Sequence, residues 1–427
     1  MMTTISSRAF RPVVRGIRLT ATATCLAALA SCALDATNPG PIQADALNAP
    51  SALGSIVSGS GRDLAEALNW TAYTGGAVAR EIFPGGSSGA FGISVQQQNG
   101  RLTDDDGGTW WDFSQRARWT AEDAVARAKV ALGTAAATSS VNAQALIWAG
   151  YANRHLGENF CEGVINGGAP GPSTIYFERA ENNFTEAISV ATAANNTTLA
   201  QAATAGRAAV RLARNNLSGA VTDAAAVPST FVYRMPYYQN ELDQYNRIFW
   251  ASANQPYRAH TIWNTTYETI RKATRDPRIP FDSSATVLVG DAAVGTLGRV
   301  RWYFQTKYPV LTSAINLSSG WEMRLIEAEA KLVANDVGGA LTLINGRRTA
   351  LALPAATAAD INDAWTLLKR ERGIELWLEG RRLGDLRRWA ALSRPGVYDA
   401  KEELPGRSLC FVTPLSEKQT NPNFLKP

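Results

Sequence analysis

Three glutamates near the end of the chain have a spacing that could support catalysis. Glu371, Glu375 and Glu379 follow one another at four-residue intervals, so on one helix they would share a face and repel one another. Two such carboxylates could act as general acid and base, for example in the hydrolysis of a polysaccharide. The alternative is a structural ion network with the charged neighbours Arg372, Arg381, Asp385 and Arg388. We favour the structural interpretation, because these arginines are close enough in sequence to compensate the glutamates.

The other chemically versatile residues form no convincing catalytic or metal-binding pattern. The two histidines, His155 and His260, and the few cysteines lack zinc-type spacing, and no phosphate-binding glycine loop occurs. We therefore expect no metal and no cofactor. Residues 85–89 match the G-x-S-x-G motif of hydrolases, but Pro84 precedes them and no helical pattern follows. A flexible loop is favoured there over a nucleophile elbow, which needs a strand and then a helix.

Aromatic residues on irregular segments are the candidates for ligand contact. Trp and Tyr rings can stack on sugar faces, and neighbouring polar groups then fix the orientation of the sugar. Six residues are our candidates: Trp110, Trp111, Tyr237, Tyr238, Trp263 and Trp302. Internal packing or contact with a partner is the alternative for each of them. Trp119, Trp148, Trp321, Trp377 and Trp389 lie on helical patterns, as Trp110 also does, and are expected in the core.

Helices must position most of these residues. Apolar residues recur three and four positions apart, which predicts helices at 52–68, 70–80, 110–132, 141–157, 176–194, 198–216, 321–333 and 337–350. A further helical run at 367–389 contains Gly380 and Gly384, which suggest close packing or a bend. Residues 227–320 are rich in proline and aromatic residues and have loop and short-strand character. The expected fold is mostly α, with tetratricopeptide-like helical hairpins and a loop-rich, short-strand, ligand-binding half.

The first 31 residues have the pattern of an export signal. Four arginines precede an apolar stretch at 19–30, which is too short to span a bilayer. Leu29-Ala30-Ser31-Cys32 resembles a bacterial lipobox, so we expect lipid attachment at Cys32 after removal of residues 1–31. An ordinary secretory signal is the alternative, and Cys25 is a weaker candidate. Without the four arginines the formal net charge falls from +5 to +1, which argues against nucleic-acid binding.

Two cysteines, Cys161 and Cys410, follow Cys32 in the sequence. An exported chain meets an oxidising compartment, so we expect these two cysteines to form a disulfide that fixes the C-terminal segment to the helical scaffold. Two separately buried thiols are the alternative, because free cysteine is among the most buried residue types. Geometry decides between them, since a disulfide needs Cα atoms about 4.4–6.8 Å apart.

The segment 321–389 resembles the C-terminal signature of the SusD/RagB family of nutrient-binding outer-membrane lipoproteins. The family pattern has an R-x-x-E-A helix, then N-x-x-R, then E-R-x-x-E-L-x-x-E-G-x-R-x-x-D-L-x-R-W. Residues 371–389 fill every named position of the last element. Residues 275–278 resemble the family's D-P-R turn, and residues 410–424 resemble its closing segment. The resemblance extends over nearly all of 32–427, and the signature glutamates are structural in that family.

The resemblance implies one domain at 51–427 behind a tether at 32–50. Its helical scaffold would occupy about 51–226 and 321–392, its irregular part about 227–320, and its tail 393–427. The chain would be an outer-membrane lipoprotein, lipid-anchored and exposed at the cell surface, that binds a glycan, an oligosaccharide or a peptide without catalytic turnover. It would pass this nutrient to a SusC-like TonB-dependent transporter. Two alternatives stay open, a lipid-anchored polysaccharide hydrolase with a Glu/Asp pair and a helical-repeat scaffold without ligand.

Overall fold

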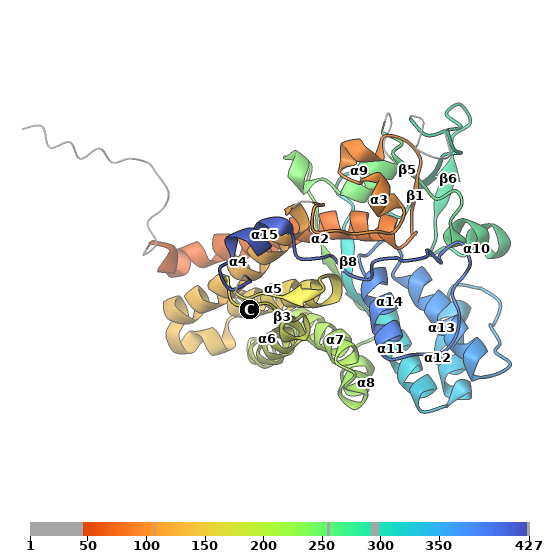
Figure 1. Ribbon diagram of the computed structural model, residues 1–427. Helices are drawn as coiled ribbons and strands as arrows, with labels where there is room; N and C mark the ends of the chain where they lie inside the picture. The colour runs from red at the N-terminus through yellow and green to blue at the C-terminus, as the bar shows by residue number, and fades with distance from the viewer. Residues whose placement is uncertain (1–45, 107, 254–256, 292–298, 425–427) are drawn as a thin grey trace, which may run out of the picture. The chain divides into compact units, whose positions relative to one another are not determined.

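Helices dominate the computed structural model, which describes residues 46–106, 108–253, 257–291 and 299–424 (Figure 1). The N-terminal part of the scaffold contains six longer helices: α2 (Leu53–Val78), α4 (Thr109–Leu132), α5 (Ser140–Asn159), α6 (Thr174–Ala193), α7 (Thr197–Ala213) and α8 (Leu217–Ala225). The signature region adds α11 (Gly320–Val333), α12 (Val337–Ala350), α13 (Ile361–Glu375) and α14 (Arg382–Ala391). The mostly helical fold with paired helices that the sequence predicts is therefore confirmed.

The helical hairpins are joined by a recurring two-residue turn. Asn195, Asn215 and Asn335 each follow the end of a helix with a positive φ of 55°, 58° and 61°. Asparagine tolerates this left-handed conformation better than most residues. The next residue in each case, Asn196, Asn216 or Asp336, caps the following helix by accepting a hydrogen bond from a backbone N–H three residues on. The same local chemistry thus reverses the chain between α6 and α7, between α7 and α8, and between α11 and α12.

The first long helix is continuous, and the prediction of two helices at 52–68 and 70–80 is wrong. α2 runs unbroken through Asn69, because the side chain of this residue bonds across to another segment rather than to its own backbone. Its Nδ2 donates to the Tyr245 carbonyl at 2.5 Å, and its Oδ1 accepts from the Arg247 N–H at 2.7 Å. This contact holds the loop that follows strand β4 (Val232–Met235) against α2.

The helical run 367–389 is divided into α13 and α14. Leu378 and Gly380 between them have positive φ values of 60° and 71°, so the chain turns there and Glu379 lies outside both helices. The expectation that Glu371, Glu375 and Glu379 share one helix face is therefore wrong for Glu379. The bend expected at Gly380 is confirmed, whereas Gly384 lies within α14 against the backbone of Glu158.

The rest of the described chain consists of short elements. Four two-stranded antiparallel pairs occur: β1 (Phe83–Pro84) with β5 (His260–Thr261), β2 (Glu162–Gly163) with β3 (Gly171–Pro172), β4 (Val232–Met235) with β8 (Ile315–Ser319), and β6 (Phe281–Ser283) with β7 (Tyr303–Gln305). The short helices are α3 (Val95–Gln98), α9 (Arg247–Ser252), α10 (Thr266–Thr274) and α15 (Leu415–Thr420), with 3-10 turns at η1 (Ala46–Asn48), η2 (Pro50–Ala52), η3 (Ser88–Phe91), η4 (Gly133–Thr138) and η5 (Leu242–Gln244). Strands β1, β5 and β6 and helices α3 and α9 gather on one side of α2 (Figure 1).

Alanine-rich helix faces build the largest core, which lies among α2, α4, α5, α6 and α7. Phe184 fills the space between α5, α6 and α7, and a Cβ at Gly150 or Gly206 would come within 2.6 Å or 2.4 Å of its ring. These glycines therefore allow the helices to approach a large side chain closely. Among the described helices, none combines the length and the apolar character needed to cross a membrane.

Candidate ligand-binding site

Four of the six aromatic candidates are buried, namely three tryptophans and Tyr237. Trp110, Trp111 and Trp302 are 6%, 3% and 1% exposed. Their indole N–H groups donate to Thr74 Oγ1, Glu417 Oε2 and the Ser252 carbonyl, respectively. Their rings are committed to packing inside the protein, so their positions give no support to the ligand-binding expectation. Trp263 is half-buried and packs edge-on against Phe83, with 5.5 Å between the ring centroids.

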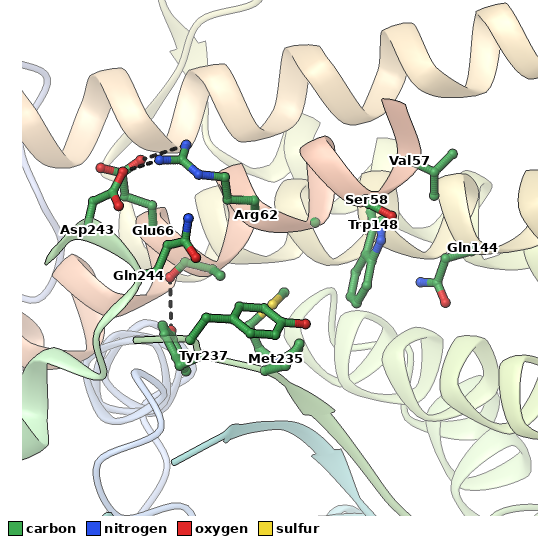
Figure 2. A pocket seen from close by; sticks show the side chains of 14 residues that line it. Val57, Ser58, Arg62, Glu66, Gln144, Trp148, Met235, Tyr237, Asp243 and Gln244 are labelled. Carbon is green, nitrogen blue, oxygen red and sulfur yellow. Dashed lines mark hydrogen bonds and ion pairs between the residues drawn. The ribbon is translucent and has the colours of Figure 1, made fainter. Parts of the chain in front are cut away.

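Tyr237 and Tyr238, the other two candidates, line a cavity of about 280 Å³ beside α2 (Figure 2). Tyr237 is buried and donates its hydroxyl to the Ala65 carbonyl at 2.9 Å, so it fixes the segment after β4 to α2. Tyr238 is 53% exposed. An adjacent pair of tyrosines thus supplies one ring that anchors the wall and one ring that solvent or a ligand can reach.

Trp148 from α5 gives this cavity its second accessible aromatic ring. It is half-buried and packs against Tyr233 with a centroid distance of 5.9 Å. Gly61 on α2 makes room for it, because a Cβ at Gly61 would lie 2.9 Å from Trp148 Nε1. The helical pattern around Trp148 predicts a core residue, but the side chain is only partly buried.

Polar and charged groups complete the cavity wall. Gln144 and Trp148 lie at one end, and Arg62, Glu66 and Asp243 gather at the other (Figure 2). Arg62 forms an ion pair with Asp243 and lies 3.8 Å from Glu66. Burial raises the pKa of Glu66, although Arg116 and Arg62 oppose this shift. The volume is at the lower end of the range for small-molecule sites, and the combination of rings and planar polar groups suits a hydroxyl-rich ligand.

A second group of accessible aromatic rings surrounds α9. Trp250 packs edge-on against Tyr245 and Phe91 at centroid distances of 5.6 Å, and Tyr257, which is 42% exposed, packs against both Phe91 and Trp250. Arg247 lies over the Trp70 ring at 3.4 Å, and burial lowers the pKa of its guanidinium to about 10. The proline- and aromatic-rich composition of 227–320 indicates this region, but single residues such as Tyr257 carry no further signal.

Trp119 is a further exception to the core expectation. It is 53% exposed on α4, beside an open hollow that Trp111 also lines. Trp377 and Trp389, by contrast, are buried as predicted.

The signature glutamates each bind cationic side chains, and Arg278 is shared by Glu371 and Glu375. Glu371 accepts from Arg278 and Arg348 at 2.6 Å each, and Glu375 accepts from both Arg347 and Arg278. Glu379 accepts from Lys307 at 2.8 Å and from Asn316. Burial raises the pKa of Glu379, with Lys307 opposing the shift. All three carboxylates are buried or nearly so, and each is held by cationic groups instead of facing an open cleft.

The other signature charges extend the network. Arg372 donates to Asp385 at 2.7 Å, Arg381 bonds Glu158 and Glu322, and Arg388 binds Glu329 and Asp385. Burial alone would raise the pKa of Asp385, but Arg372 and Arg388 hold it below its usual range. These ion pairs connect α13 and α14 with α5 and α11, and Arg278 of the D-P-R turn joins α13 as well.

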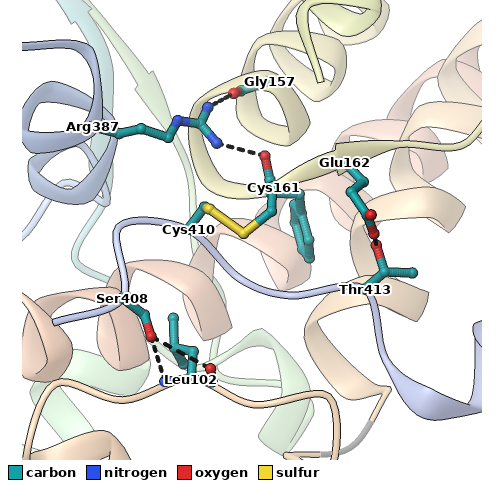
Figure 3. The surroundings of a disulfide bond; sticks show 9 residues. Leu102, Gly157, Cys161, Glu162, Arg387, Ser408, Cys410 and Thr413 are labelled. Atoms are coloured by element: carbon teal, nitrogen blue, oxygen red, sulfur yellow. Dashed lines mark hydrogen bonds between the residues drawn. A yellow bond between two sulfur atoms is a disulfide. The ribbon is translucent and has the colours of Figure 1, made fainter. Parts of the chain in front are cut away.

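A disulfide links Cys161 to Cys410, with a Cα–Cα distance of 5.1 Å, so the predicted bridge is present. It joins the chain two residues beyond the end of α5 to the C-terminal segment (Figure 3). The Cys161 N–H donates to the Phe411 carbonyl and the Phe411 N–H donates to the Asn159 carbonyl, so backbone bonds flank the bridge. Cys32 and residues 1–31 lie outside the described residues.

No cluster of His, Cys, Asp and Glu that could hold a metal ion occurs in the described part of the chain. His155 and His260 are separately buried, and burial lowers the pKa of each imidazole to about 3. His155 forms hydrogen bonds with Thr71 and Ser114, and His260 forms one with Tyr73.

Known proteins resemble this chain in part of its sequence and in its fold. Residues 301–425 match the model of the SusD family. A SusD superfamily protein from Bacteroides vulgatus has a similar structure, with a TM-score of 0.63, 13% identity, and coverage of 87% of this chain and 97% of that one. A laminarin-binding SusD-like protein has a TM-score of 0.62 and 14% identity, with coverage of 87% of this chain and 97% of that one. A chitin-binding SusD homolog from Flavobacterium johnsoniae has a TM-score of 0.59 and 12% identity, with coverage of 87% of this chain and 94% of that one. The search of curated proteins gave no match.

Proposed function

We propose that the chain is a SusD-family protein that binds a glycan or an oligosaccharide at the cavity beside α2. The match of residues 301–425 to the SusD family and the similar fold of a SusD superfamily structure support this assignment. Two structural relatives are described as laminarin-binding and chitin-binding proteins, so glycan is the ligand class that the similarities support. The identity of the glycan would depend on loop residues, because loops commonly carry the binding residues of a fold.

The convergence of two accessible rings with polar side chains carries this proposal. Tyr238 and Trp148 come from segments far apart in the sequence, and Gln144, Gln244 and Arg62 line the same cavity. Sugar rings present an apolar face and a rim of hydroxyl groups, which this combination of groups can bind. The anchored Tyr237 and the Arg62–Asp243 ion pair would preorganise the wall.

The proposal includes binding without turnover. A glycosidase would need two carboxyl groups about 5–10 Å apart that both reach the bond to be cleaved. The signature glutamates are buried against cations, which favours the structural role. By analogy with the family, the protein would be anchored in the outer membrane through Cys32, face the cell exterior, and pass its ligand to a SusC-like TonB-dependent transporter.

The cavity can be tested by calorimetry after a glycan array has identified a ligand. Tyr238→Ala should weaken binding about tenfold, because it removes the most accessible ring of the site. Trp250→Ala in the α9 aromatic group is the matched control and should leave the affinity unchanged. Loss of binding in Trp250→Ala with full binding in Tyr238→Ala would place the site at α9 instead. Hydrolysis of the glycan by the wild-type protein would contradict the binding function itself.

A further inference from the structure

A second cavity, of about 410 Å³, lies beside the disulfide. Its wall is formed by the end of α5, the start of α6, the end of α7 and residues of α14 between 384 and 391. Cys161 and Cys410 also line it. It shares no lining residue with the cavity beside α2. Figure 3 shows Arg387, one of its lining residues, directed at the backbone next to Cys161.

Cations outnumber anions on the wall of this cavity. Five arginines and two carboxylates, Glu158 and Asp385, line it; the arginines are Arg214, Arg372, Arg381, Arg387 and Arg388. Deeper carboxylates compensate part of this charge, since Arg381 also meets Glu322 and Arg388 also meets Glu329. Arg214 pairs with Glu181 at 2.5 Å.

Arg387 is the arginine that the network leaves without a counter-ion. Its guanidinium donates to the carbonyl oxygens of Gly157 and Phe160, and it forms no ion pair with a carboxylate in the described chain. Burial lowers the pKa of Arg387, and Glu158 opposes this shift from a distance. A half-buried cation that binds neutral carbonyls would gain from a nearby anion.

Arg372 provides an independent indication. Its side chain is 1% exposed, and within the described residues its Nη1 has no hydrogen-bond partner. Buried polar atoms normally have a partner, so an N–H group left unpaired in a residue that lines a cavity points to a ligand.

The N-terminal end of α6 faces the same cavity. Ser173 and Thr174 line the wall, and the side chain of Ser173 makes no capping hydrogen bond at the start of this 20-residue helix. Free N–H groups and the helix dipole make such an end attractive to anions.

We propose that this cavity binds a small oxyanion, the carboxylate or sulfate group of an acidic sugar or of a free ion. Guanidinium groups match the planar geometry of a carboxylate and can donate two parallel hydrogen bonds to it. The volume leaves room for the sugar that carries the group. The site is separate from the cavity beside α2 and does not depend on the function proposed there.

The test uses the complete mature protein with three probes, namely sodium sulfate, D-glucuronate and neutral D-glucose, at an ionic strength held constant with sodium chloride. Sulfate and glucuronate should bind in calorimetry and raise the melting temperature, whereas glucose should do neither at this site. Arg387→Gln should weaken anion binding roughly 10- to 100-fold, as expected for loss of a charged hydrogen-bonding group. Arg387→Lys keeps the charge and should retain most of the affinity.

The control is Arg234→Gln, which removes an exposed arginine of β4 and should change nothing. If Arg387→Gln does not fold, Arg214→Gln replaces it and should lower the affinity several-fold. Absence of binding by both anions would overturn the proposal, as would anion binding that both glutamine variants at the cavity leave intact. Binding of sulfate but not glucuronate would support a site for free ions, and equal binding would support an acidic sugar. Loss of neutral-glycan binding in Tyr238→Ala concerns the other cavity alone.

Discussion

Glu81, just beyond the end of α2, is a carboxyl group removed from water. Its Oε1 accepts the Leu378 N–H at 2.9 Å, and among the described residues its Oε2 has no hydrogen-bond partner. Burial raises the pKa of Glu81 to about 7, although the Leu378 N–H, Arg382 and Lys307 oppose the shift. A neutral carboxyl group is thus the form that the fold accommodates best.

This pKa makes stability depend on pH near neutrality. Between pH 4.5 and about 7 the folded chain binds the Glu81 proton more tightly than the unfolded chain does, so stability falls as the pH rises through this range. Glu81→Gln stays neutral and keeps an acceptor for Leu378. We expect it to match the wild-type protein at pH 5 and to exceed its unfolding free energy at pH 8 by up to about 3 kcal/mol. Urea unfolding of both proteins at the two pH values checks this, and equal stability at pH 8 would contradict it.

Gly61 permits a second prediction at the scale of one residue. Gly61→Ala would push the Trp148 ring away from α2, since the new Cβ would lie 2.9 Å from it. The steric cost of about 1–3 kcal/mol is partly offset by the better helix propensity of alanine, so the variant should fold, with glycan affinity reduced.

Gly59→Ala is the matched control for this change. It lies on the same helix with no heavy atom within 4 Å of its added Cβ, and it should gain up to about 1 kcal/mol of stability with normal affinity. Calorimetry and thermal unfolding of both variants provide the comparison. Normal affinity in Gly61→Ala would exclude Trp148 from the ligand site.

At the scale of elements, Glu375 joins three segments. It accepts two hydrogen bonds from Arg347 of α12 and one from Arg278 of the D-P-R turn, while it belongs to α13. Glu375→Gln should lower the unfolding free energy by about 2 kcal/mol, because the buried Arg278 and the partly exposed Arg347 both lose a counter-charge. The affinity for glycan per folded molecule should not change, since Glu375 does not line the cavity beside α2.

Glu186→Gln is the control for this change, because its pair with Lys129 is exposed and should contribute less than about 1 kcal/mol. Thermal unfolding and calorimetry separate the two effects. Glycan hydrolysis that disappears in Glu375→Gln would establish a catalytic role instead.

The disulfide joins two elements that are 249 residues apart in the sequence. Loss of a link that closes so long a loop removes about 5 kcal/mol in the chain-entropy model, which is an upper figure. Cys161→Ser with Cys410→Ser should therefore lower the unfolding free energy by about 2–5 kcal/mol. Thiol titration of the unreduced, unfolded wild-type protein should detect neither cysteine. Two titratable thiols from these positions would contradict the bridge.

At the scale of the whole molecule, membrane attachment is the property to test. The lipobox-like sequence before Cys32 predicts removal of residues 1–31 and lipid attachment at this cysteine. Durable anchoring needs more than one acyl chain, and Cys32→Ser removes the residue to which these chains would be attached. The variant should therefore move from the membrane fraction to the soluble fraction. Cys161→Ser is the control for cysteine loss and should stay with the membrane. Unchanged fractionation of Cys32→Ser would exclude this anchor.

Much of the architecture could be predicted from local patterns. Apolar periodicity predicts most of the longer helices. The pattern of charged residues at 371–389 is long enough to indicate a particular arrangement of ion pairs. The turns at Asn195–Asn196, Asn215–Asn216 and Asn335–Asp336 had a usable signal as well, since asparagine both adopts a positive φ and caps helices. A two-residue turn between α7 and α8 explains why the predicted helix 198–216 stops early.

The ligand cavity could not be predicted in the same way. Burial of an aromatic ring depends on which segments the fold brings against it, and neither Trp302 nor Trp148 shows this in its local sequence. Trp302 is almost completely buried, whereas Trp148, on a helical pattern, is only partly buried. The cavity brings together α2, α5 and the segment after β4, whose proximity is a property of the tertiary structure.

The bridge between Cys161 and Cys410 also turns most of the chain into a covalent ring. Tyr237 and Tyr238 of the cavity, Tyr245, Trp250 and Tyr257 of the α9 aromatic group, and the whole signature region lie within this ring. Phe91 and helices α2, α4 and α5 precede it. A protease that cuts one loop inside the ring opens the backbone but releases no fragment, since both new ends stay attached through the sulfur atoms. Damage of this kind leaves the severed parts tethered to the helices that precede the ring, where they can still pack together.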